Sequence, residues 1–170
     1  NVNRIRAIGT AALRESQNGP EVAERLSSIS GIHIEIIDGQ QEAKYNLDGI
    51  RSALPHLDKF GLIMDIGGGS VEFILFKGDN VAFAESFKIG VAILYNVYHR
   101  SDPIKEEEII QLETELDLQL QSLKSALQKV SKYYLIGASG SFEILHEVLP
   151  SIQSGEHWAE LELTGIEDNM

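Results

Sequence analysis

The chain has 170 residues, no cysteine and a formal net charge of −12, and 43% of its residues are hydrophobic. This length suits one ordinary domain or two small lobes with a buried core, and the composition excludes wholesale disorder. Without cysteine, a disulfide scaffold, a thiolate metal site and a thiol nucleophile are excluded. The acidic balance argues against a general nucleic-acid or anionic-membrane surface, because such surfaces are basic.

The acidic residues are unevenly distributed along the chain. The first hundred residues carry 10 Lys and Arg against 12 Asp and Glu, whereas the last seventy carry 4 against 14. We therefore expect a phosphate-rich ligand to bind within the first hundred. No segment resembles a signal peptide or a membrane-spanning helix, so we expect a cytoplasmic protein without membrane contact. The start at Asn1, without Met, suggests a piece of a longer protein.

Strand-like and helical stretches alternate through the first sixty residues. In chain order they are a strand at 4–9, a helical stretch to about residue 29 that Pro20 interrupts or restarts, a strand at 32–38 and a helix at 40–54. Apolar residues alternate in the second strand, and Pro55 ends the second helix. Two strands joined by a helical crossover predict a parallel, right-handed βαβ unit.

The second half begins with three strands and continues mainly with helices. We predict strands at 62–66, 71–76 and 81–89, a helix from Pro103 to Val130 with Asp102 as its N-cap, a strand at 133–137 and a helix at 141–149. The three consecutive strands predict an antiparallel meander. Apolar residues at three- and four-residue steps predict the long helix. The last twenty residues are weakly patterned.

The most informative motif is the segment Asp65–Glu72, which reads DIGGGSVE. A hairpin loop at 67–70 would pair Asp65 with Glu72 on one face of the sheet, with Cβ atoms about 4.5–5.5 Å apart. Two such carboxylates repel unless a cation or a shared proton compensates, and Mg²⁺ binds a few carboxylates together with ligand phosphates. Three glycines also leave backbone amides open to phosphate oxygens. The alternative is a tight turn that merely tolerates glycine.

Two further segments carry weaker indications. Residues 137–140, which read GASG, lie between a predicted strand and a predicted helix, where free helix amides could bind an anion. Turns of this kind often carry glycine for other reasons, so both interpretations stay open. Glu42 lies in the first turn of a predicted helix, where the helix dipole alone explains an acid. From its position alone we interpret Glu42 as an ordinary helix residue.

Four motifs, taken together and in order, resemble those of the exopolyphosphatase and guanosine pentaphosphate phosphatase (Ppx/GppA) family. They are GTAALR at 9–14, IIDGQQEA at 36–43, DIGGGSVE at 65–72 and GASG at 137–140. The resemblance implies an α/β, actin-like architecture of ribonuclease-H-like lobes, each a mixed sheet with flanking helices. Residues 1–58 would be the end of the first lobe and residues 59–170 the second lobe, with the active site between them.

The resemblance also implies an activity and roles for individual residues. Members of this family hydrolyse a terminal phosphoanhydride of polyphosphate or guanosine pentaphosphate with Mg²⁺. Glu42 would activate the attacking water, Asp65 and Glu72 would hold the metal and position water, and Arg14 would face the anionic substrate. Phosphate would also contact both glycine-rich loops, at Gly67, Gly68, Gly69 and Ser70 and at Gly137, Ala138, Ser139 and Gly140. The family often forms dimers, so we expect a homodimer.

This sequence departs from the family pattern in three places. Gln41 precedes Glu42 where the family often has two acids, and Lys44 stands where arginine is common. The family's N-terminal phosphate loop, Asp-x-Gly-Ser-Asn-Ser, is absent, so we expect this chain alone to be weakly active or inactive. Two other functions stay open, an ATPase or kinase of the same superfold and a non-catalytic polyphosphate or nucleotide sensor.

Overall fold

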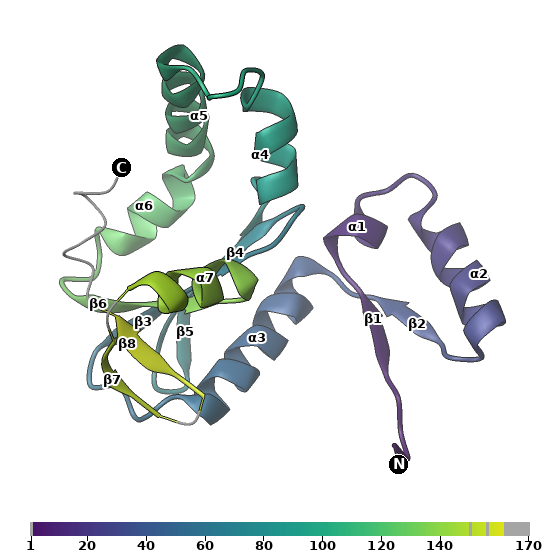
Figure 1. Ribbon diagram of the computed structural model, residues 1–170. Helices are drawn as coiled ribbons and strands as arrows, with labels where there is room; N and C mark the ends of the chain where they lie inside the picture. The colour runs from purple at the N-terminus through teal and green to yellow at the C-terminus, as the bar shows by residue number, and fades with distance from the viewer. Residues whose placement is uncertain (1, 150, 156, 162–170) are drawn as a thin grey trace.

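The computed structural model describes residues 2–149, 151–155 and 157–161, as a small N-terminal part and a larger α/β part (Figure 1). The N-terminal part contains β1 (Ala7–Gly9), α1 (Ala11–Arg14), α2 (Gly19–Ser30) and β2 (Ile34–Ile36). The two strands pair in parallel, with Ala7 opposite Ile34 and Gly9 opposite Ile36. The predicted parallel unit is confirmed, although both strands are shorter than predicted.

The helical stretch between these strands is divided into two helices. α1 ends at Arg14, and α2 begins at Gly19 with Pro20 in its first turn, a position that proline favours. After α2, Gly31 adopts φ +70°, which glycine reaches without strain, and closes the last turn. Pro20 therefore restarts the helix, one of its two predicted roles.

The larger part is built on a mixed sheet. Its strands are β3 (Phe60–Ile66), β4 (Val71–Lys77), β5 (Asn80–Phe87) and β6 (Tyr133–Ala138), in the spatial order β5-β4-β3-β6. β3, β4 and β5 form the predicted antiparallel meander, and β6 lies parallel to β3. The predicted α/β class, with a mixed sheet and flanking helices, is confirmed.

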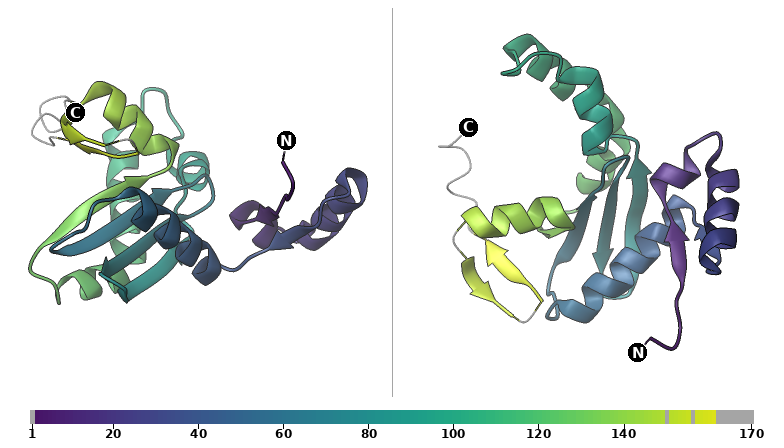
Figure 2. Two further views of the ribbon diagram at one scale, coloured as in Figure 1. Left: turned by 90° about the horizontal axis from the view of Figure 1, so that it is seen from below. Right: turned by 45° about the vertical axis from the view of Figure 1, so that its right-hand side comes forward.

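Helices cover both faces of this sheet (Figures 1 and 2). They are α3 (Gly39–Ala53) on one face, α4 (Val91–Tyr98), α5 (Glu106–Gln119) and α6 (Gln121–Leu127) toward the other, and α7 (Gly140–Val148) after β6. Leu75 packs with Leu123 of α6, and the fully buried Ile63 packs with Leu47 of α3. α3 thus packs on the sheet of the second predicted lobe, and the division at residue 58 stays a prediction.

The predicted helix from Pro103 to Val130 is wrong at its start and in its middle. The Asp102–Pro103 peptide is cis, and α5 begins only at Glu106, after Lys105 as its N-cap. Glu108 fixes this start, because its Oε2 accepts the backbone N–H of Lys105 at 2.9 Å. The helix then breaks at residue 120, so α5 and α6 are separate, and α4 was not predicted at all.

Replacing Glu108 with glutamine is expected to lower the thermal unfolding midpoint at pH 7. A hydrogen bond from Ser101, with others from backbone N–H groups, holds the pKa of Glu108 below its ordinary value of 4.5. An acid with a lowered pKa stabilises the fold above its ordinary pKa, and this contribution is lost as the pH falls through the lowered value. The difference in thermal unfolding midpoint between the variant and the wild type should therefore become smaller below about pH 4.5. Glu107→Gln, the same charge change in the same turn, should show a much smaller difference.

The C-terminal stretch that is weakly patterned in sequence contains a hairpin. β7 (Ser151–Ser154) and β8 (Ala159–Leu161) pair antiparallel, and the remainder of the last twenty residues lies largely outside the described part. Over the ranges that the structure describes, no helix is both long and apolar enough to cross a bilayer.

Candidate active site

The two glycine-rich loops lie side by side where β3 and β6 end. Asp65 and Glu72 are register partners across the 67–70 hairpin, as the motif predicts, and Ala138 of β6 is the partner of Asp65 on its other side. Ser139 Oγ donates a hydrogen bond to the Ile66 carbonyl at 3.0 Å. Because parallel strands end at the same sheet edge, this topology brings residues 65–72 and 137–140 together.

The first loop is held in place by the start of α4. The Val91 N–H donates to the Gly67 carbonyl at 3.0 Å, and the Ala92 N–H donates to the Gly68 carbonyl at 2.9 Å. Gly90 makes this approach possible, because a Cβ there would lie 2.4 Å from the Gly68 carbonyl oxygen. The loop is therefore positioned by a helix that the sequence did not reveal.

The second loop is held in an unusual backbone conformation. Ser139 has φ +72° and ψ 174°, a region that is almost confined to glycine and costs about 1–3 kcal/mol for other residues. Its hydroxyl bond to the Ile66 carbonyl ties it to the end of β3. Strain of this kind concentrates at functional sites, which fits the predicted role of residues 137–140.

Ser139 variants are expected to separate this strain from the hydrogen bond. Ser139→Ala and Ser139→Gly both remove the hydroxyl, but only glycine also relieves the positive φ. The glycine variant should therefore have a free energy of unfolding about 1–2 kcal/mol higher than the alanine variant in urea denaturation. Equal stability of the two variants would show that the backbone at residue 139 is not strained.

Glu72 is buried in the sheet, with its side chain hydrogen-bonded. The residue is only 2% exposed, and Ser86 Oγ of β5 donates to its Oε1 at 2.6 Å. Burial raises the pKa of Glu72, and the charges of Glu42 and Asp65 raise it further, against hydrogen bonds from Ser70 and Ser86 that lower it. Glu42 and Asp65 thus both lie close enough to Glu72 to raise its pKa.

Glu42 forms an ion pair with Arg14 across the two parts of the molecule. Arg14 Nη1 donates to Glu42 Oε2 at 2.9 Å and to the Ile37 carbonyl at 3.2 Å, and the two charged side chains are only 18% and 16% exposed. Burial alone would lower the pKa of Arg14, but hydrogen bonds to Glu42 and Glu15 raise it. Asp38 caps α3 by accepting the Gln41 N–H at 2.8 Å, which places Glu42 in the first turn. The predicted cation and the predicted base therefore lie together.

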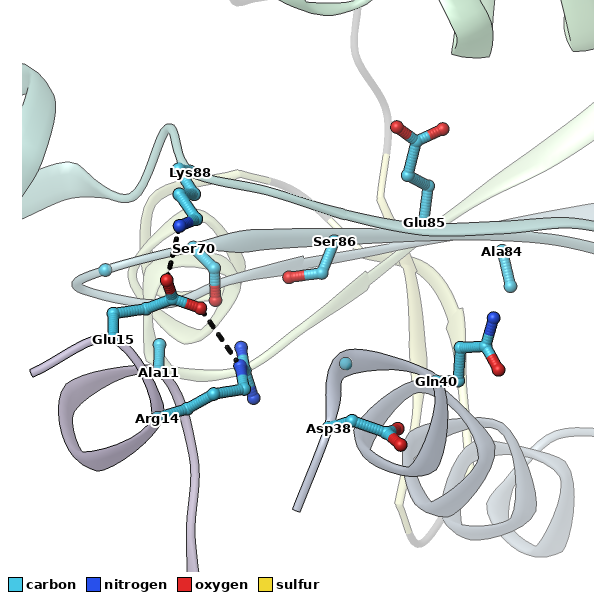
Figure 3. Close-up of a pocket in the computed structure, with 12 residues that line it drawn as sticks. Ala11, Arg14, Glu15, Asp38, Gln40, Ser70, Ala84, Glu85, Ser86 and Lys88 are labelled. Atoms are coloured by element: carbon cyan, nitrogen blue, oxygen red, sulfur yellow. Dashed lines mark hydrogen bonds and ion pairs between the residues drawn. The ribbon is translucent and has the colours of Figure 1, made fainter. Parts of the chain in front are cut away.

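A cavity of about 460 Å³ opens beside these groups (Figure 3). It lies between α1, the start of α3, the first glycine loop and β5, and its lining includes Arg14, Gly69, Ser70, Ser86 and Lys88. Several predicted site residues do not line it, namely Glu42, Asp65, Gly67, Gly68, Glu72 and residues 137–140. Of these, Glu42 and Glu72 contact lining residues through hydrogen bonds.

Several residues at the site were missed by sequence reasoning. Ser86 could have been found from the meander, because it is the register partner of Glu72 in β5. Asn46, whose Nδ2 donates to Asp65 Oδ2 at 2.6 Å, lies four residues after Glu42 on the same side of α3. Glu15 and Lys88 carry no such indication, because they approach the cavity only in the folded chain.

The Asp65 and Glu72 pair has the donor chemistry for the predicted Mg²⁺, which stays a prediction. Their carboxylates belong to directly opposed residues, and the raised pKa of Glu72 reflects, besides its burial, negative charge that a nearby cation would offset. In the part of the chain that the structure describes, no three His, Cys, Asp or Glu side chains are grouped to hold a metal by themselves. Mg²⁺ needs only one or two carboxylates when substrate phosphates and water complete its shell.

Comparison with known proteins gives a family and a set of structural relatives. The Ppx/GppA phosphatase family matches residues 1–162. The crystal structure of an exopolyphosphatase from Cytophaga hutchinsonii ATCC 33406 is 36% identical with a TM-score of 0.81, over 86% of this chain and 47% of that one. The Aquifex aeolicus Ppx/GppA family member is 27% identical with a TM-score of 0.60, over 88% of this chain and 48% of that one.

A curated relative agrees with these structures. A guanosine-5'-triphosphate,3'-diphosphate pyrophosphatase from Photobacterium profundum is 29% identical in a 153-residue alignment, and the match covers 86% of this chain and 29% of that protein. This chain therefore spans about half the length of the solved relatives and less of the curated one. The family match extends across all four motifs at the site. The chain belongs to the Ppx/GppA phosphatase family.

Proposed function

We propose that the complete protein carrying this chain hydrolyses the terminal phosphoanhydride of polyphosphate or guanosine pentaphosphate, with water activated by Glu42. The observation that carries the proposal is the Arg14–Glu42 ion pair beside a cavity lined by the first glycine loop. The names of the relatives, an exopolyphosphatase and a guanosine-5'-triphosphate,3'-diphosphate pyrophosphatase, support the same reaction class. A cytoplasmic location and a homodimer belong to the proposal.

The roles of the residues follow from what phosphoryl transfer requires. The reaction needs the reacting groups to be positioned and their charge neutralised more than it needs covalent chemistry. Glu42, oriented by Arg14, would bind the attacking water and accept its proton. Backbone amides of the first loop, which reaches the cavity wall at Gly69 and Ser70, would donate to phosphate oxygens.

Asp65 and Glu72 would hold Mg²⁺. When bound, the ion would neutralise charge on the phosphate oxygens. Asn46 and Ser86 keep the two carboxylates in place by hydrogen bonds of 2.6 Å each. The Asn46 bond leaves the second oxygen of the Asp65 carboxylate for a ligand or water, whereas the Glu72 carboxylate accepts hydrogen bonds from both Ser70 and Ser86.

Parallel assays of the complete protein test this function. Phosphate release should occur from polyphosphate or from guanosine pentaphosphate with Mg²⁺, and chelation with EDTA should abolish it. Phosphate release that persists in EDTA would contradict the proposed dependence on Mg²⁺. Phosphate transfer from ATP to an acceptor would indicate a kinase, and binding without release would indicate a sensor.

A further inference from the structure

Glu15 bridges two cations at the edge of the cavity. Its Oε2 forms an ion pair with Lys88 Nζ, and its Oε1 accepts a hydrogen bond from Arg14 Nε at 3.2 Å. Figure 3 shows the carboxylate between the ammonium and the guanidinium groups. All three residues line the cavity together with Gly69 and Ser70 of the first loop. A carboxylate thus lies where two cations and a glycine-rich loop face one cavity.

The two sides of the Arg14 guanidinium have different partners. Nη1 is held by Glu42 and by a backbone carbonyl, at 18% side-chain exposure, whereas Nε faces Glu15. Glu15 and Lys88 are far more exposed, at 40% and 73%. Ion pairs in such exposed positions add little to stability, so a better anion can replace Glu15 without disturbing the Arg14–Glu42 pair.

We propose that Lys88 and the Nε edge of Arg14 form an additional phosphate-binding position, which Glu15 occupies until the substrate displaces it. This inference rests on the proposed function, because the ligand it requires is a phosphate chain. A phosphate group has more negative charge and more acceptor oxygens than a carboxylate, so both cations bind it more strongly. Lys88 and Glu15 belong to no motif that the sequence analysis identified.

The position gives the site a preference for highly charged ligands. A single phosphate group near Glu42 leaves Glu15 in place, and Glu15 then repels it. An oligophosphate brings a further phosphate group that can replace Glu15 and bind Arg14 and Lys88. Displacement therefore favours a chain over the free phosphate that the reaction releases.

Kinetics of the complete protein with tripolyphosphate test the inference. Glu15→Gln should lower KM about 3–10-fold and Lys88→Ala should raise it by a similar factor, with kcat changed by less than about twofold in both. Lys88→Ala should also reduce the slope of log KM against log salt by about one, because one cation is lost. Asp117→Asn and Lys124→Ala are matched controls, because that exposed pair, with atoms 2.7 Å apart, lies on α5 and α6.

The possible outcomes separate this inference from the proposed function. An unchanged or raised KM in Glu15→Gln would overturn the inference. An equal shift of KM in Asp117→Asn would also overturn it, because the change in net charge alone would then explain the effect. If the wild type releases no phosphate, the proposed function fails, and calorimetric titration with tripolyphosphate decides the inference. Tighter binding by Glu15→Gln and weaker binding by Lys88→Ala would then support it, and equal binding would overturn it.

Discussion

Replacing Glu42 with glutamine in the complete protein is expected to lower kcat for phosphate release by about 10²–10⁴-fold, the usual contribution of a general base. The amide is nearly the same size and can still accept the hydrogen bond from Arg14 Nη1, so the first turn of α3 should remain in place. It cannot take a proton from water. Because the substrate contacts are retained, KM should change far less than kcat.

The control for this variant is Glu21→Gln. Glu21 is an exposed acid in the first turn of α2, so the substitution makes the same chemical change at the start of another helix. Its kcat should match that of the wild type. If Glu42→Gln keeps more than about a third of kcat, Glu42 is not the base, and the interpretation of Glu42 as an ordinary first-turn acid is correct.

Gly90→Ala is expected to displace the first glycine loop. The added Cβ would lie 2.4 Å from the carbonyl oxygen of Gly68 and 2.4 Å from the carbonyl carbon of Gly69, both backbone atoms that cannot rotate away. The loop or α4 must therefore move, which should cost about 1–3 kcal/mol of unfolding free energy. Because misplacement by about 1 Å can cost about a hundredfold in rate, kcat should fall by a similar factor.

Gly68→Ala serves as the stability control for Gly90→Ala. A Cβ at Gly68 meets no heavy atom within 4 Å, so the substitution should change the free energy of unfolding by less than about 0.5 kcal/mol. Urea denaturation of both variants beside the wild type measures the difference. Equal stability of Gly90→Ala and Gly68→Ala would contradict the tight contact between α4 and the loop.

Local pattern was enough to predict the hairpin that carries Asp65 and Glu72. Apolar residues in strands of this length and three consecutive glycines are typical of a hairpin, and the structure has the predicted register of Asp65 with Glu72. The start of α5 was mispredicted. Asp102 with Pro103 looks like a helix start, whereas the hydrogen bond from the Lys105 N–H to Glu108 begins the helix three residues later than Pro103.

The contacts within the site depend on tertiary structure. Arg14 and Glu42 are 28 residues apart on different helices, and only the family resemblance linked either of them to the substrate before their ion pair was seen. Helix α4 was not predicted because its sequence, VAILYNVY, has no charged residues and so shows no alternation of apolar and charged positions at helical spacing. Lys88 approaches Glu15 only because β5 ends beside α1 at the cavity.

The hydrogen bonds from α4 to the first loop also set the direction of the backbone N–H groups in that loop. In a trans peptide the C=O and the next N–H point in opposite directions. Because the carbonyls of Gly67 and Gly68 are bound by α4, the N–H groups of Gly68 and Gly69 point away from that helix. Each bound carbonyl also polarises its own peptide unit, which strengthens the N–H as a donor. Helix α4 therefore orients the N–H groups of Gly68 and Gly69 and strengthens them as donors, although the helix itself need not contact the ligand that they would bind.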